Sequence, residues 1–132
     1  MRTRSTQTRN SVQFGVARRG LPSAASFRRW SLGAPVTIRI VGASEGRRLN
    51  REYRGKNKPT NILSFHSGDI VLCHPVVARE AKQQKKPLAA HYAHLVVHGV
   101  LHLRGLRHGK RMEAREIRIL RRFGFADPYT VE

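Results

Sequence analysis

Residues 87–104 read PLAAHYAHLVVHGVLHLR, and this stretch decides the fold. Apolar residues occupy nearly every side of a helix drawn through it, so the pattern predicts a helix that is buried against a sheet. Gly105 follows at once, and glycine commonly stands where a helix ends. The stretch therefore predicts a domain with a buried, histidine-bearing helix.

The flanking segments predict the remaining elements. Three strands are expected, at residues 36–41, 62–65 and 69–73. Three further helices are expected, at residues 43–53, 75–86 and 110–123. Together these elements predict a single small α+β domain covering residues 1–132, with a short mixed sheet of about three to four strands packed by helices.

The N-terminal part of the chain is strongly basic. Residues 1–31 contain seven arginines and no acidic residue. This composition predicts a flexible basic arm over residues 1–20, and an organellar transit peptide is the minority alternative. Phe27 and Trp30 are expected to anchor the following segment onto the core.

Charge and cysteine content narrow the function classes. The chain carries 26 Lys and Arg against 8 Asp and Glu, a net charge of +18, which predicts a polyanionic partner such as nucleic acid. No run approaches the roughly 20 apolar residues of a membrane span. The single cysteine, Cys73, excludes an internal disulfide, is expected to be a buried strand residue, and indicates a reducing compartment such as the cytoplasm.

The central helix carries an unusual set of imidazoles on one face. They are His91, His94, His98 and His102. His98 and His102 lie one helical turn apart, a spacing that a single Zn²⁺ accepts. Gly105 then lets the chain turn back, so that His108 can supply a third nitrogen. Three imidazoles leave one tetrahedral position open, which is typical of a catalytic rather than a structural zinc site.

The other two histidines have a different expected role. His91 and His94 lie too far from the helix end to share a metal with His108, so we expect them to form hydrogen bonds. His94 is the better candidate for a partner of a ligating imidazole. The pattern H-x-x-x-H-x-x-G-x-x-H is similar to the elongated zinc-protease motif, but Gly99 stands where that motif requires a glutamate general base. Peptide hydrolysis is therefore disfavoured.

Two sequence blocks carry a resemblance to a known family. They are HGVLHLRGLRH at residues 98–108 and NREYRGKNKPTNILSF at residues 50–65. With these blocks the chain resembles the YbeY family of rRNA maturation endoribonucleases, as a shortened member, from about residue 20 onward. The resemblance implies an α+β fold, one Zn²⁺ held by three histidines and a water, and cleavage of single-stranded ribosomal RNA. The family matures the 3′ end of the small-subunit RNA and takes part in ribosome quality control.

The resemblance also implies roles for particular residues. The zinc ligands would be His98, His102 and His108. Arg54 matches the functional arginine of the family, and its charged fork suits the scissile phosphate. Lys56 and Lys58 share the Arg54 loop and are expected to hold flanking phosphates, with solvated loop charge as the alternative.

Two positions near the motifs complete the expectations. Asp69 is expected to serve a turn or a cap rather than to accept a hydrogen bond from a ligating imidazole. Arg107 stands where the family usually has Asp, directly before the third histidine, and its positive charge predicts weaker metal binding.

Two alternatives to the nuclease remain at the level of sequence. In the first, the zinc only stabilises a small core and the chain binds RNA or the ribosome without cleaving. In the second, the chain is a peptide hydrolase, which Gly99 opposes. The implied partners are single-stranded ribosomal RNA and the ribosome or its associated factors, with no membrane.

Overall fold

Four strands form one open sheet in residues 10–130, the part of the chain that this computed structural model describes. They are β1 (Ser11–Phe14), β2 (Thr37–Val41), β3 (Ile62–Ser64) and β4 (Asp69–Cys73). Their order in the sheet is β1-β2-β4-β3. Strand β2 is parallel to both β1 and β4, whereas β3 is antiparallel to β4. The sequence prediction of a short mixed sheet is confirmed.

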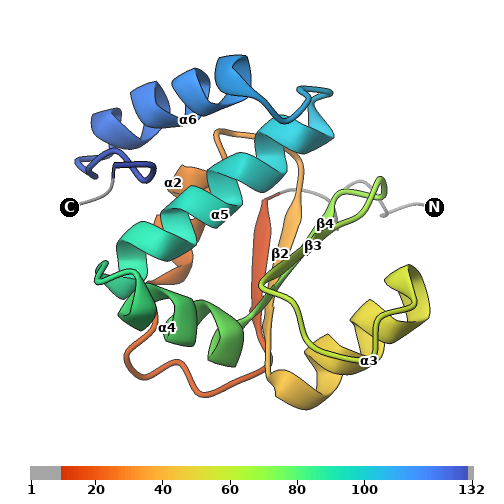
Figure 1. Cartoon of the computed structure of the whole chain (residues 1–132). Helices are drawn as coiled ribbons and strands as arrows, with labels where there is room; N and C mark the ends of the chain where they lie inside the picture. The colour runs from red at the N-terminus through yellow and green to blue at the C-terminus, as the bar shows by residue number, and fades with distance from the viewer. Residues whose placement is uncertain (1–9, 131–132) are drawn as a thin grey trace.

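Helices cover both faces of this sheet. They are α2 (Ala24–Trp30), α3 (Ala43–Arg54), α4 (His74–Gln83), α5 (Leu88–Leu103) and α6 (Lys110–Arg122). Figure 1 shows α2, α4, α5 and α6 on one side of the strands and α3 on the other. Because side chains alternate along a strand, Ile70 and Leu72 of β4 join the core under α5, while Val71 packs with Leu49 of α3.

Helix α5 is the buried helix that the sequence predicts. Its Val96, Val97 and Val100 are fully buried. The helix lies close to the sheet edge because Gly99 has no side chain. A Cβ at Gly99 would lie 3.1 Å from both Ile62 Cδ1 and Ser64 Oγ of β3.

The end of α5 turns the chain back towards the cleft. Gly105 has a φ of 95°, a conformation that favours glycine. Its N–H donates to the His102 carbonyl at 3.0 Å, and the Leu106 N–H donates to the Leu101 carbonyl at 3.1 Å. These bonds satisfy carbonyls that a helix end leaves free, and the chain returns to begin α6.

The N-terminal part differs from the sequence prediction. The expected basic arm over residues 1–20 includes Ser11–Phe14, which forms β1 and pairs with β2. Its Val12 and Phe14 pack against the core, a contact with distant residues that a basic composition does not indicate. Residues 1–9 of that arm lie outside the described residues. Phe27 and Trp30 of helix α2 are buried and anchor the segment as expected.

Cys73 is buried at the end of β4, as expected. Within residues 10–130, no helix combines the length and apolar character needed to cross a membrane.

Candidate active site

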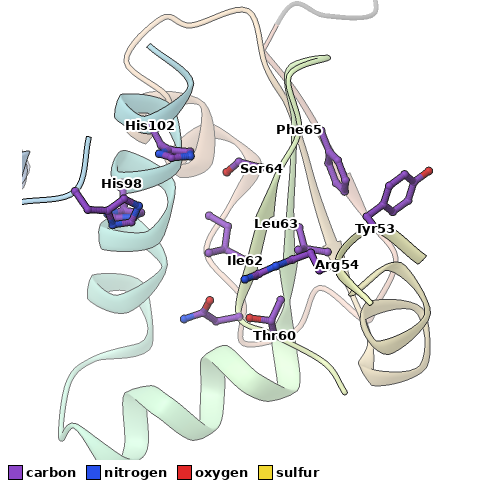
Figure 2. A pocket seen from close by; sticks show the side chains of 11 residues that line it. Tyr53, Arg54, Thr60, Ile62, Leu63, Ser64, Phe65, His98 and His102 are labelled. Atoms are coloured by element: carbon purple, nitrogen blue, oxygen red, sulfur yellow. The ribbon is translucent and has the colours of Figure 1, made fainter. Parts of the chain in front are cut away.

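A cavity of about 570 Å³ opens between α5, β3 and the end of α3. Segments that are far apart in the sequence form its wall, which Figure 2 shows from close by. The lining residues are Tyr53, Arg54, Thr60, Asn61, Ile62, Leu63, Ser64, Phe65, His98, His102 and His108. The cavity thus brings together the two sequence blocks on which the site prediction rests.

Three of the cavity histidines are neighbours in space. The ring centroid of His108 lies 4.8 Å from that of His98 and 5.3 Å from that of His102. His98 and His102 come from successive turns of α5, and the turn at Gly105 returns His108 to them. The structure therefore brings together the three residues that the sequence nominates as ligands.

The donor set suits a borderline-soft cation such as zinc. Neutral imidazole nitrogens are common zinc ligands and bind at about 2 Å, so the ring centroids of ligands on one tetrahedral ion lie about 5 Å apart. The observed centroid distances match this value. Within residues 10–130, however, no three His, Cys, Asp or Glu side chains are already arranged to hold a metal ion.

A buried carboxylate lies behind the histidines. Glu116 of α6 is fully buried. The Nδ1–H of His98 donates to Glu116 Oε2 at 2.6 Å, and the Nε2–H of His94 donates to Oε1 at 3.1 Å. The hydroxyl of Tyr129 also donates to Oε1. All three bonds favour the ionised carboxylate.

Glu116 is ionised despite its burial. Burial raises the pKa of a carboxyl group, but here the hydrogen bonds from His94, His98 and Tyr129 outweigh that effect and lower the pKa of Glu116 to about 2. Burial, together with the hydrogen bond to Glu116, raises the pKa of Tyr129 above its ordinary value. The phenol therefore keeps its proton and acts as a donor.

Arg54 reaches the cavity from the opposite side. It is the last residue of α3, and Gly55 ends the helix in the left-handed conformation with a φ of 71°. Figure 2 shows its side chain beside Ile62 and Leu63, directed towards the helix that carries His98 and His102. A guanidinium in this position can pair with an anion held between the two sides.

The two nominated lysines lie elsewhere. Lys56 and Lys58 are exposed in the loop after α3 and are not part of the cavity wall. That loop is tied to α3, because Asn50 Nδ2 donates to the Lys58 carbonyl at 2.7 Å. The lysines can therefore contact a long ligand only beyond the mouth of the cavity.

His91 and His94 both form hydrogen bonds, as expected. His91 Nε2 bonds Glu80 Oε1 at 2.8 Å, and His94 Nε2 bonds Glu116 Oε1 at 3.1 Å. The partner of His98 is Glu116, however, and not His94 as the sequence suggested. Asp69 serves a turn, because its carboxylate accepts from the Ser67 hydroxyl at 2.8 Å.

Sequence reasoning missed Glu116 and the polar wall of the cavity. Met112, Glu116 and Leu120 are spaced four residues apart and are all buried in α6, so an acid within an apolar stripe was the available signal. Thr60 and Ser64 belong to the quoted block at residues 50–65, but nothing in the sequence alone placed them opposite the histidines.

The chain is similar to known proteins along most of its length. The family model described as Endoribonuclease YbeY matches residues 3–124. A protein named Endoribonuclease YbeY from Aromatoleum aromaticum is 50% identical over 125 residues, which cover 82% of this chain and 81% of that protein. Another of the same name, from Nitrosomonas eutropha, is 47% identical over 139 residues, covering 92% and 99%.

A solved structure agrees with the fold. The solution structure of a protein from Thermotoga maritima matches with a TM-score of 0.54 at 21% identity, covering 83% of this chain and 86% of that one. At this identity the likeness concerns the fold alone. Taken with the family match across both cavity-forming blocks, the chain belongs to the endoribonuclease YbeY family.

Proposed function

We propose that this chain is a zinc-dependent endoribonuclease that cleaves single-stranded ribosomal RNA in the cavity between α5 and β3. The proposal rests mainly on one observation, which is that His98, His102 and His108 line the same cavity as Arg54. A triad of imidazoles beside a fixed cation suits a phosphodiester, whose negative charge grows during cleavage.

The three histidines would hold the ion, and the ion would supply Lewis-acid chemistry to a phosphodiester in the cavity. Arg54 binds two oxygens of the scissile phosphate through its planar fork and stabilises the charge that develops there. Lys56 and Lys58 hold phosphates outside the cavity, on the same side as Arg54. The sequence departure at Arg107, which is exposed, adds positive charge next to His108 and is expected to weaken zinc binding.

Aromatic residues at the rim favour an unpaired substrate. The Tyr53 side chain is 63% exposed, and its ring meets that of Phe65 edge-on at 5.0 Å. An exposed ring on the cavity wall can stack with a base that is not paired, whereas bases inside a duplex are already stacked. This arrangement supports single-stranded RNA as the substrate.

The position of the proposed ligands supports catalysis over simple stabilisation of the fold. A zinc that only stabilises a core is closed off by its protein ligands, but His102 and His108 are exposed at an open cavity. Peptide hydrolysis has no support, because Gly99 stands where the zinc-protease motif requires a glutamate, and a Cβ there would already be in tight contact, at 3.1 Å, with Ile62 and Ser64. We further propose that the chain acts in the cytoplasm with ribosomes, in rRNA maturation and ribosome quality control.

The direct test is cleavage of matched single-stranded and duplex ribosomal RNA fragments by the purified protein. We expect cleavage of the single strand, its loss with a chelator and its return with added zinc. His102→Ala should be inactive, which guards against contaminating nucleases. Tyr53→Ala should reduce the preference for the single strand. RNA binding without cleavage by zinc-loaded protein would instead support the non-catalytic alternative.

A further inference from the structure

The Glu116 carboxylate has two oxygens with separate partners. Oε2 accepts only from His98 Nδ1, at 2.6 Å, among the hydrogen bonds of the described residues. Oε1 accepts from His94 Nε2, at 3.1 Å, and from the Tyr129 hydroxyl. One oxygen therefore contacts a candidate zinc ligand, and the other is fixed by two donors that lie outside the cavity wall.

This arrangement determines where the proton of His98 resides. Oε1 already accepts from the Tyr129 hydroxyl and the His94 ring, and Oε2 has the His98 ring as its one hydrogen-bond partner among the described residues. With Oε2 accepting in the same way, the hydrogen of the 2.6 Å bond lies on His98 Nδ1. In the neutral ring the other nitrogen, Nε2, then carries a lone pair. Nε2 forms no hydrogen bond to any residue of the described chain, and His98 lines the cavity. The nitrogen that is left free is the one available to a cation.

The carboxylate itself is held firmly. Glu116 is 0% exposed and lies between Met112 and Leu120, each 1% exposed, on the face of α6 that packs against α5. The ring of Tyr129 lies edge-on to His94 at 5.2 Å, so the C-terminal segment closes the far side of the group. Burying a charged group costs free energy unless the group is hydrogen-bonded, and the Glu116 carboxylate accepts hydrogen bonds from three donors.

We propose that Glu116 is a positioning residue of the metal site, which fixes the Nδ1–H tautomer and the ring orientation of His98 so that Nε2 is presented to the ion. The inference rests on the proposed function for the identity of the ion. A carboxylate behind a ligating imidazole also raises the basicity of the ligand, and loss of such a partner typically weakens metal binding 10- to 100-fold.

The test uses two measurements on the full chain. Long-range ¹H–¹⁵N spectra of the zinc-free protein report the tautomer of His98, and competition with a chromogenic chelator reports zinc affinity. In the unmodified protein we expect the Nδ1–H form of His98. In Glu116→Gln, of nearly the same shape, we expect a mixture of tautomers and a roughly 10- to 100-fold loss of zinc affinity.

Two further variants separate positioning from general stability. Glu116→Asp keeps the charge and should recover part of the zinc affinity. Tyr129→Phe removes a bond to Oε1 but leaves the His98 bond in place, so it should keep the tautomer and change zinc affinity far less than Glu116→Gln. Amide spectra establish that each variant is folded.

The outcomes distinguish this proposal from the proposed function. A His98 ring in the Nε2–H form in the unmodified protein overturns the role of Glu116, as does unchanged zinc affinity in a folded Glu116→Gln. A protein that shows the Nδ1–H form but binds no zinc contradicts the metal site and leaves the Glu116–His98 contact intact.

Discussion

Gly99 of α5 lies so close to Ser64 of β3 that a Cβ on the glycine would be 3.1 Å from the serine Oγ. This approach sets the distance between the helix that carries the histidines and the strand that forms the opposite wall. A side chain at this position would have to displace Ser64 or Ile62 by a few tenths of an ångström.

Gly99→Ala should therefore destabilise the protein. In an open helix alanine is about 1 kcal/mol more favourable than glycine, but here the added methyl overpacks Ile62 and Ser64, at a cost of about 1–3 kcal/mol. Urea unfolding should show a net loss of stability, and Gly99→Val should lose more. Ala114→Gly, at an exposed position of α6, measures the propensity effect alone. A more stable Gly99→Ala would contradict the close packing.

Arg54→Ala should lower kcat by about 10²- to 10³-fold, the usual effect of removing a group that stabilises developing charge. Arg54→Lys should recover little, because an ammonium does not reproduce the planar fork. The matched control is Arg51→Ala, an exposed arginine of the same helix that is not part of the cavity wall. The measurement is the single-turnover cleavage rate of each variant. An equal loss of rate in Arg54→Ala and Arg51→Ala would contradict a specific role for Arg54.

Lys56 and Lys58 are expected to act through phosphates outside the cavity. Replacing both with Ala should reduce the slope of log affinity against log salt for single-stranded RNA by about 1.4, because each phosphate contact contributes about 0.7. Arg118→Ala with Arg122→Ala removes the same charge from an exposed part of α6. Filter-binding titrations over a range of salt would compare the two pairs. If both double variants change the slope equally, Lys56 and Lys58 contribute only through the net charge of the protein and not through specific phosphate contacts.

The sequence predicted what local patterns encode. The apolar run at residues 87–104 and the spacing of His98 and His102 depend on neighbours within one helix, and both were predicted. Strand β1 was missed because its stability comes from pairing with β2, 26 residues away between Ser11 and Thr37. Glu116 was missed for the same physical reason. Its partners His94 and His98 belong to another helix, and only the packing of α6 on α5 brings them together.

Acid should destabilise the zinc-free protein through the half-buried His74 and the buried His91. Burial lowers the pKa of His74 and of His91 below the ordinary value, and for His91 it outweighs the raising effect of Glu80. Well above pH 6.5 both rings are neutral in the folded and unfolded chains, so neither affects stability. As the pH falls below 6.5, the unfolded chain binds protons first, and the free energy of unfolding decreases.

The measurement is urea unfolding of the zinc-free protein between about pH 7.5 and pH 5. This range extends roughly one pH unit or more on either side of the ordinary histidine pKa of about 6.5. A double variant, His74→Gln with His91→Gln, should show a flatter decline than the unmodified chain. His66→Gln, at an exposed position, should keep the original slope and is the control. An unchanged slope in the double variant would assign the acid sensitivity to other groups.

The most direct test of the account is the rate of single-stranded RNA cleavage measured against the amount of zinc bound per chain. We expect the rate to rise in proportion to bound zinc and to level off at one ion per chain. His102→Ala should bind no zinc and cleave no RNA, while His66→Ala should match the unmodified protein. Cleavage by zinc-free protein, or an undiminished rate in His102→Ala, would contradict a metal-dependent nuclease in this cavity.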